Sequence, residues 1–569
     1  MSVTVTKIEN PIWRDWLKSA TTPGIGAIIS LTIIGGVLRL IRLSHPPLLY
    51  DEAATYTRVV GSFREMIETL RFDGFPPVHY ELYWLMARIV RLTPWMMRIV
   101  PALAGTLMIP AIYFLARQMF SRRVATLAAA ITCFSAYMLV YSRDAKMYME
   151  LWLLATLFIA CLLLWMRTQS RIAWLAWVAC ACAMNGLQGL GLCVTGVGLV
   201  IVLLHPRLTT RKLLWAIAGC VIACVGLLGY FLFFNRWGQS IYQTGWHASG
   251  LEWIDQRGSR MGRLMVLWDT LVSWMLAYRS PRPPITAPSR VIQPVAIVSG
   301  ILIVLLILGA MPWPKRLRDD DEDDSLETRG PLWMALWVVL PSIGFALASA
   351  IGGHDLFNAR YLAIVWPALA VLIAWSIQRL PLPWLRASAI GLLIGANAFQ
   401  YVLRVSVESG VPVDQIAHDL ALAKKSNGTV KTIVVAGDNP QANGLFASGG
   451  ITDFPGKYYL AIESHLHLKP HQLRDQPLRK VFDLPTDVVS IPSTCERVVV
   501  WADGHNVQAE DDPILQKLGV GWIRTSSQEH QVRDFWCWRT EFRCRRSVYT
   551  RESDGETASE TPRHKNKAK

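Results

Sequence analysis

Long apolar runs dominate the chain between residues 24 and 403. A membrane-spanning helix needs about 20 mostly apolar residues, and eleven stretches reach or approach that requirement. The predicted spans are 24–43, 97–117, 124–141, 148–167, 172–185, 188–204, 213–234, 290–311, 331–352, 360–378 and 384–403. This pattern predicts an α-helical polytopic membrane protein in which residues 24–403 form the transmembrane domain.

One apolar stretch, residues 78–92, is too short to span and carries Glu81, Arg88 and Arg91. We expect it to form a helix that lies in the membrane interface, because Trp84 and neighbouring tyrosines are typical interfacial anchors. It belongs to a long loop, residues 44–96, between the first two predicted spans.

Composition agrees with a membrane protein and gives an orientation. Of 569 residues, 52% are hydrophobic and 17% are charged, and the formal net charge is +15. When 78–92 is not counted as a span, every short basic loop falls on the side of the N-terminal segment 1–23, as the positive-inside rule requires for a cytoplasmic face. The charge therefore needs no nucleic acid partner. We expect loop 44–96 and everything after residue 404 to lie outside the cytoplasm.

The C-terminal part has the composition of a soluble domain. Residues 432–436 and 498–501 are apolar and rich in valine, which predicts buried strands, and 413–423 has helical periodicity. We predict an extracytoplasmic α/β domain over 404–550 and a disordered basic tail over 551–569. Its three cysteines allow one disulfide and leave one odd thiol; they are Cys495, Cys537 and Cys544.

Two adjacent carboxylates, Asp51 and Glu52, follow Tyr50 shortly after the first span. Adjacent side chains diverge, so two separate roles are more natural than a shared proton: a general base, and a group that binds a substrate or a basic neighbour. The alternative is a helix N-terminus in which both acids only stabilise the helix dipole.

Several cations on the predicted outer side run against the positive-inside trend. They are Arg39, Arg42, Arg143, Lys146 and Arg360. Together they indicate a site for an anionic group such as phosphate, which matches the paired donors of arginine. The alternatives are pairing with Asp144 or Glu150, and contact with lipid phosphates. His79, near the start of the interfacial segment, is either a functional residue or a packed histidine.

The order of these motifs resembles a known family. Tyr50-Asp51-Glu52-Ala53, Pro76-Pro77-Val78-His79-Tyr80, Ser142-Arg143-Asp144-Ala145-Lys146-Met147-Tyr148 and Arg360-Tyr361 follow one another along the chain. This arrangement is similar to the bacterial family-39 and aminoarabinose-transferase-like glycosyltransferases, membrane enzymes of the GT-C fold related to protein O-mannosyltransferases. The chain departs from the family at Phe75, where a histidine often precedes the two prolines.

The resemblance implies an inverting transfer of a sugar from a polyprenyl-phosphate donor to an acceptor hydroxyl at the outer membrane face. It implies Asp51 as the catalytic base, with Glu52 orienting the acceptor or an arginine. The residues expected to bind substrate or phosphate are Arg143, Lys146, Arg360, Tyr361, Arg42, Tyr50 and His79. No cofactor is implied, and no spacing of metal ligands is present. The acceptor is a protein, a lipid or a glycan.

Two other classes of function are compatible with many spans. A lipid or solute transporter, or a flippase, is expected to carry charges near the middle of its helices, whereas here the polar groups gather toward the outer rim. A sensor would use the C-terminal domain to bind its ligand, but no residue in that domain identifies one. The sequence favours surface chemistry on a lipid-linked donor.

Overall fold

The structure is a computed structural model of the chain, divided into two compact units that are described separately here. Residues that the structure describes are 23–44, 50–73, 75–205, 208–234, 289–310, 329–352, 359–406, parts of 415–429, 430–434, 494–503, 522–533 and 540–551. The predicted loop 235–289 and the tail after residue 551 lie outside these residues.

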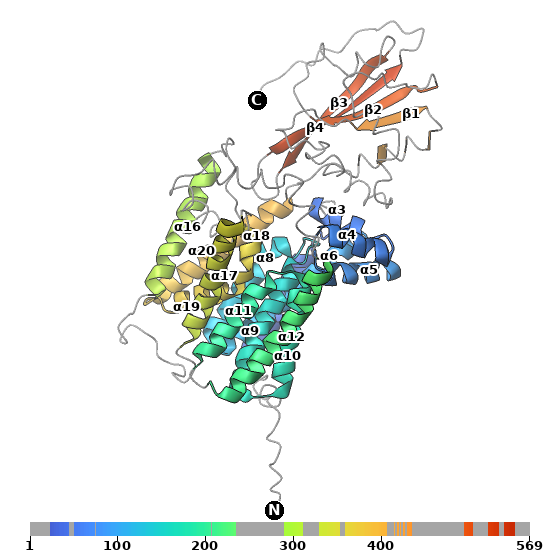
Figure 1. The fold of residues 1–569 in the computed structure, drawn as a ribbon. Helices are drawn as coiled ribbons and strands as arrows, with labels where there is room; N and C mark the ends of the chain where they lie inside the picture. Colours follow the sequence, from blue (N-terminus) through green and yellow to red (C-terminus); the bar gives the residue numbers. More distant parts are fainter. Residues whose placement is uncertain are drawn as a thin grey trace, which may run out of the picture. The chain divides into compact units, whose positions relative to one another are not determined.

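The first unit is helical throughout its described residues (Figure 1). Its helices are α2 (Pro23–Leu40), α3 (Tyr50–Val59), α4 (Phe63–Asp73), α5 (Val78–Ile89), α6 (Pro94–Arg117), α7 (Arg122–Phe134), α8 (Ala136–Tyr141), α9 (Tyr148–Thr168), α10 (Arg171–Leu187), α11 (Gly191–Leu204), α12 (Thr210–Phe234), α16 (Ser289–Ala310), α17 (Gly330–Gly352), α18 (Ala359–Leu362), α19 (Trp366–Gln378) and α20 (Pro383–Ser406). The predicted spans all fall on these helices.

Among the described residues, three helical segments are long and apolar enough to cross a membrane. They are Pro94–Arg117, Tyr148–Thr168 and Arg360–Gln378. The protein is therefore mostly helical with membrane-spanning segments, as predicted. The count of eleven spans stays a prediction.

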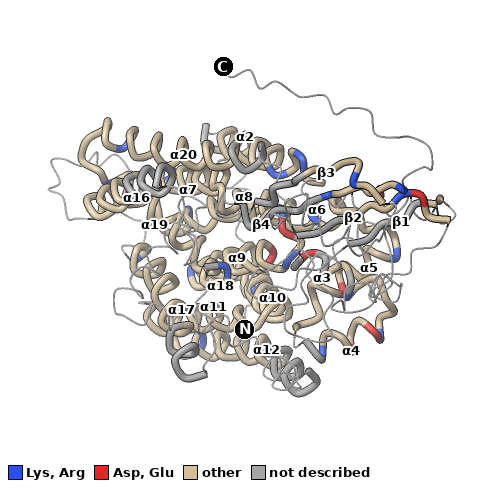
Figure 2. The backbone as a smooth tube through the Cα atoms, turned by 90° about the horizontal axis from the view of Figure 1, so that it is seen from above, with Lys and Arg blue, Asp and Glu red and all other residues tan. Residues whose placement is uncertain are grey.

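The core of the first unit lies around α9, which packs against α6 and α10. Trp152 and Trp177 are fully buried there. The indole of Trp177 stacks on that of Trp165, with ring centroids 5.7 Å apart. Large aromatic side chains fill the space between helices. Charged residues are sparse in the bundle seen from above in Figure 2, and in the long helices they occur mainly near the first and last residues. The charged groups of the bundle are therefore concentrated at the ends of its helices.

Loop 44–96 contains three short helices, α3, α4 and α5. The predicted interfacial helix is present as α5, which begins after Pro77 and has 12 residues. The prediction did not include α4, whereas α3 begins at the Asp-Glu pair, as the alternative interpretation of that motif expected. Their sequences are mostly polar with apolar side chains on one face, among them Met66 and Leu70, which are fully buried. These helices place the Asp-Glu pair beside the helical bundle.

The prediction of one continuous helix over 124–141 was wrong. The helix is interrupted at Ser135, which ends α7 and begins α8. The Ser135 hydroxyl accepts a hydrogen bond from the Met138 amide at 3.3 Å, and the Ala136 amide donates to Asn397 Oδ1 of α20 at 2.9 Å. These side chains take up amides that a continuous helix would bond internally. Stretch 360–378 is likewise divided into α18, a 3₁₀ turn and α19.

The second unit contains a four-stranded sheet in the order β1-β2-β4-β3, built from β1 (Val430–Val434), β2 (Arg497–Asp503), β3 (Trp522–Arg533) and β4 (Thr540–Arg551). Strands β1 and β2 are parallel, and the other neighbours are antiparallel. Both predicted strands are present. The Arg546 guanidinium of β4 forms an ion pair with the Asp419 carboxylate, with N–O distances of 2.7 and 2.8 Å. Most of the predicted helix 413–423, Cys537 and the side chain of Cys544 lie outside the described residues, so the disulfide stays a prediction.

Two glycines of α16 provide a matched test of helix packing. A Cβ at Gly309 would collide with the backbone of Ser376 in α19, whereas a Cβ at Gly300 would meet nothing within 4 Å. We expect Gly309→Ala to lower the free energy of unfolding by about 1–3 kcal/mol through overpacking. Gly300→Ala should leave it unchanged or raise it by up to about 1 kcal/mol, because alanine favours helices. Thermal unfolding in detergent measures both, and equal melting temperatures for the two variants would contradict the close approach of α16 and α19.

Candidate active site

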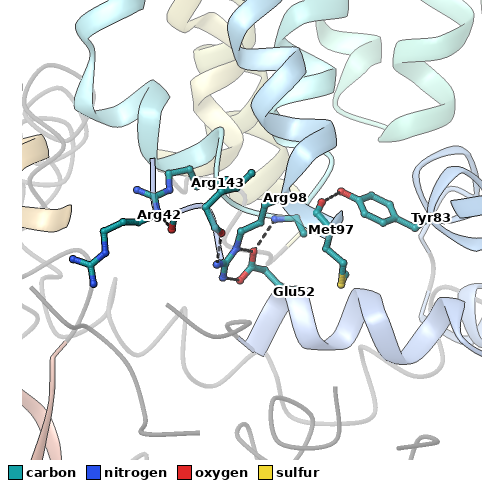
Figure 3. A network of polar contacts seen from close by, with 8 residues as sticks. Arg42, Glu52, Tyr83, Met97, Arg98 and Arg143 are labelled. Atoms are coloured by element: carbon teal, nitrogen blue, oxygen red, sulfur yellow. Dashed lines mark hydrogen bonds and ion pairs between the residues drawn. The ribbon is translucent and has the colours of Figure 1, made fainter. Parts of the chain in front are cut away.

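A buried ion pair holds the Asp-Glu segment against the bundle (Figure 3). Arg98, near the start of α6, donates from Nε to Glu52 Oε1 at 2.7 Å and from Nη2 to Glu52 Oε2 at 2.6 Å. Neither side chain is exposed to solvent by more than 1%. This two-pronged geometry is the strongest arrangement available to an arginine and a carboxylate.

The same pair also binds two loop segments. Arg98 Nη1 donates to the carbonyl of Leu43, just beyond α2, at 3.1 Å. Glu52 Oε1 accepts a hydrogen bond from the amide of Ala145 at 3.0 Å. The pair therefore connects the end of α2, helix α3, helix α6 and the loop 142–147.

Asp51 is the second residue of α3 and immediately precedes Glu52. The structure describes its place in the helix, and the side chains of Tyr50 and Asp51 lie outside the described part. The position of Asp51 is fixed by its neighbour, since the Glu52 carboxylate is held by Arg98 and Ala145. Glu52 thus meets an arginine, one of the two partners that the resemblance implies for it.

Sequence reasoning missed Arg98. Arg98 lies in the first turns of a predicted span, where a cation can serve only to orient the helix in the membrane. The signal available in the sequence was that both ends of this span are basic, with Arg98 near the outer end and Arg117 at the opposite end. The partner, Glu52, is 46 residues away, so no local pattern identifies it.

Arg143 lies on the side of the loop 142–147 that faces the end of α2. Its Nη2 donates to the carbonyl of Arg42 at 2.6 Å, and the two residues are neighbours in Figure 3. Arg42 is exposed and has a left-handed backbone, with φ of 53°. Burial lowers the pKa of the Arg143 guanidinium. Tyr401 and the Glu52 carboxylate oppose this shift, while the charges of Arg98 and Arg42 add to it. This crowding of partly desolvated cations favours an anion nearby.

Arg39 was expected on the outer rim as well, but it is buried within the bundle. Its guanidinium donates to Ser142 Oγ at 3.1 Å and to the carbonyls of Gly35 and Thr132 at 2.9 and 3.3 Å. The prediction of Arg39 as a rim cation was wrong, because its guanidinium donates to groups inside the fold. Arg39 instead anchors the beginning of loop 142–147 to α2.

Lys146 is directed to a different neighbourhood from that of Arg143. Its side chain is buried, and its Nζ lies 5.9 Å from the centre of the Phe75 ring, within range of a cation–π contact. Phe75 is the residue that replaces the family histidine before the two prolines. The loop 142–147 therefore separates its two cations, with Arg143 toward Arg42 and Lys146 toward Phe75.

His79 of α5 is buried beside Lys146 and Glu150. Its Nδ1 lies 3.7 Å from Glu150 Oε1, and its ring packs against those of Tyr80 and Tyr83 at centroid distances of 5.2 and 4.8 Å. Burial lowers the pKa of His79 to about 3, and the charges of Lys146 and Arg58 act in the same direction, while the Ala145 backbone opposes them. The imidazole is therefore neutral at physiological pH.

Arg360 and Tyr361 lie at the start of α18. The Arg360 guanidinium is 5.1 Å from the centre of the Tyr361 ring. Tyr361 in turn lies 6.4 Å from the ring of Tyr148, which is the first residue of α9 after loop 142–147. Tyr361 therefore connects α18 to the end of loop 142–147 through its contact with the Tyr148 ring. Tyr148 belongs to an aromatic group that sequence reasoning did not single out, together with Tyr137, Tyr141 and Trp152.

No three His, Cys, Asp or Glu side chains lie close enough together to hold a metal ion within the part of the chain that the structure describes. The described groups at the site are carboxylates, guanidiniums, one buried ammonium and aromatic rings. This set suits acid–base chemistry next to an anionic leaving group.

The family described as dolichyl-phosphate-mannose-protein mannosyltransferase matches residues 75–230. Over this stretch the chain is similar to that family. The matched residues include α5, α6 and the loop 142–147, and they end before Arg360 and begin after Asp51. This similarity agrees with the resemblance that the motifs predict, over the matched residues. Comparison with curated proteins gives no match.

Solved structures similar to this chain include the two that follow. The oligosaccharyltransferase of Archaeoglobus fulgidus in the apo form is 14% identical, over 85% of this chain and 70% of that chain, with a TM-score of 0.42. ArnT from Cupriavidus metallidurans in the apo state is 13% identical, over 92% of this chain and 98% of that chain, with a TM-score of 0.38. ArnT bound to undecaprenyl phosphate gives the same values. The substrate of this chain must be argued from its own residues.

The Arg98–Glu52 pair is open to a double-mutant cycle. We expect Arg98→Met and Glu52→Leu each to lower the free energy of unfolding by about 3–5 kcal/mol, because each leaves a buried charge without its partner. The double variant should lose clearly less than the sum of the two, since no charge then stays behind. Denaturant unfolding of the purified protein measures all three variants, and additive losses would show that the two charges do not stabilise one another.

The buried His79 should make stability depend on pH. Its pKa is lower in the folded state than the ordinary 6.5, so the unfolded chain binds the proton more readily and acid favours unfolding. The stability that a neutral His79 confers is complete above about pH 6.5 and is lost as pH falls toward 3. We expect acidification from pH 7.5 to pH 5 to lower the melting temperature of the wild type relative to that of His79→Gln. An identical fall in both proteins would contradict a neutral buried His79.

Proposed function

We propose that the protein is an inverting glycosyltransferase that moves a sugar from a polyprenyl-phosphate donor to an acceptor hydroxyl at the outer face of the membrane. The observation that carries this proposal is the buried Arg98–Glu52 pair, which ties the helix of Asp51 to the loop 142–147. A carboxylate and a cation-bearing loop are thereby held together at one end of the bundle. The match to the mannosyltransferase family supports the same activity.

Asp51 is the proposed base. As the acceptor oxygen forms its bond to C1 of the sugar, its proton passes to the Asp51 carboxylate, and the bond between C1 and the phosphate oxygen breaks. Glu52 is a positioning residue in this scheme, because its carboxylate is occupied by Arg98 and Ala145. Inversion at C1 follows from attack on the face opposite the leaving phosphate.

The departing lipid phosphate gains negative charge that cations must stabilise. Arg143 and Arg42 are the proposed principal groups, because they lie together at the end of α2. Lys146, from the same loop, and Arg360 and Tyr361, from α18, complete the set. The isoprenoid tail would lie along apolar side chains that α2 leaves exposed, such as Ile33 and Val37.

The proposed topology extends the three described membrane-spanning segments to eleven. The N-terminal segment 1–23 is placed in the cytoplasm, and the C-terminal domain 404–550 outside it, at a bacterial inner membrane. Charged residues near the ends of the described helices support this orientation, because the basic loops then share one side. They also argue against a transporter or flippase, which would need charges along the middle of its helices.

The acceptor is a protein, a lipid or a glycan hydroxyl, and no metal takes part.

Asp51→Asn tests the proposed chemistry. The amide cannot accept the acceptor's proton, so we expect transfer to fall by about 10² or more, the usual contribution of a general base. The assay follows release of undecaprenyl phosphate, by mass spectrometry, from a panel of undecaprenyl-phosphate hexoses and pentoses in membranes that contain the protein.

The matched control is Glu68→Gln. Glu68 is an exposed carboxylate of α4 that pairs with Arg64 one helical turn away, so its loss should leave the release rate near that of the wild type. Near-normal release by Asp51→Asn would exclude this residue as the base. Absence of release from every donor, by the wild-type protein, would exclude the proposed donor class.

A further inference from the structure

A group of buried polar atoms lies between α5 and α9, away from Arg143 and Arg42. It comprises both ring nitrogens of His79, the hydroxyl of Tyr80 and both carboxylate oxygens of Glu150. None of these atoms has a hydrogen bond of good distance and angle with any described residue, although the Ala145 backbone lies close enough to His79 to raise its pKa. His79 and Tyr80 are almost completely buried, and the Glu150 side chain is 12% exposed.

Buried polar atoms are nearly always hydrogen-bonded, because removing them from water without a partner costs free energy. Here His79 Nδ1 lies 3.7 Å from Glu150 Oε1, and the Tyr80 ring packs on that of His79 with centroids 5.2 Å apart. A single orphaned atom has many explanations, but a cluster on two helices indicates a place that a polar ligand fills.

The chemistry of the cluster selects the ligand. A cation is unsuitable because Lys146 and Arg58 lie close enough to influence His79. A hydroxyl group both donates and accepts, which matches a carboxyl group, a phenol, and a neutral imidazole with one donor and one acceptor nitrogen.

Aromatic rings border the same atoms. The rings of Tyr80 and Tyr83 pack on His79, and Phe75 lies 6.0 Å from Tyr80. Sugar rings combine hydroxyl groups with apolar C–H faces, and binding sites for such ligands pair apolar walls with a few placed polar groups. We propose that His79, Tyr80 and Glu150 form a subsite that binds the hydroxyl-bearing ring of a sugar.

This inference rests on the proposed function and deepens it. It assigns His79 to sugar recognition and leaves phosphate recognition to the side of Arg143. Lys146 lies between the two, since its ammonium contacts Phe75 and influences His79. The hydroxyl groups belong to the donor sugar or to a sugar of the acceptor, and the experiment below distinguishes them.

Native mass spectrometry of the full chain in detergent provides the test, with three kinds of probe: undecaprenyl phosphate, a panel of undecaprenyl-phosphate hexoses and pentoses, and the corresponding methyl glycosides. For a donor subsite we expect at least one sugar-bearing lipid to bind about tenfold more tightly than undecaprenyl phosphate. Tyr80→Phe and Glu150→Gln should remove that gain and leave the affinity for undecaprenyl phosphate unchanged. For an acceptor subsite, methyl glycosides should bind to protein already loaded with undecaprenyl phosphate, and both variants should abolish that binding.

The matched control is Tyr83→Phe, on the same helix. The Tyr83 hydroxyl donates to the carbonyl of Met97, so its removal affects packing but not the proposed subsite, and the gain from the sugar should persist. The inference is overturned if no sugar improves binding, or if Tyr80→Phe and Tyr83→Phe have the same effect. Failure of the wild-type protein to bind any polyprenyl lipid would overturn the proposed function itself, whereas binding of undecaprenyl phosphate without a gain from any sugar overturns only the subsite.

Discussion

The Arg98–Glu52 ion pair is the interaction on which the described site depends. A buried charge is tolerated only when another charge and further hydrogen bonds compensate the loss of water. Here the remaining capacity of both groups is used by the Leu43 carbonyl and the Ala145 amide. As a result, the pair fixes the relative positions of four segments that are distant in sequence. Helix α3 has only ten residues and a polar composition, so it gains its place from this pair more than from apolar packing.

The loop 142–147 is the second element that organises the site, because its two cations reach different surroundings. Arg143 joins Arg42 near the end of α2, and Lys146 is buried against Phe75. Glu52 holds the loop between them, at Ala145. An enzyme that separates a sugar from a phosphate must recognise both parts of its donor, and a loop with two differently directed ends offers a physical means to do so.

The sequence predicted the helical regions of the first unit well where apolar length decides the structure. The short segment after Pro77 was predicted as a helix that does not span, and α5 has 12 residues. Prediction was wrong at 124–141, because the break at Ser135 is stabilised by Asn397, 261 residues from Ala136. It also placed Arg39 on the rim, although that side chain folds inward to Ser142 and Thr132. Such side-chain directions depend on which helices are neighbours.

The sequence by itself determined that the chain belongs in a membrane, which stretches are helical, and in what order the polar motifs occur, since hydrophobic length and charge are local properties. Only the tertiary structure decided which polar groups meet. It paired Glu52 with Arg98, separated Arg143 from Lys146, and placed Glu150 beside His79. Each of these pairings joins different helices or loops, and the energy that favours it comes from burial and from mutual hydrogen bonding, which exist only after the helices have packed.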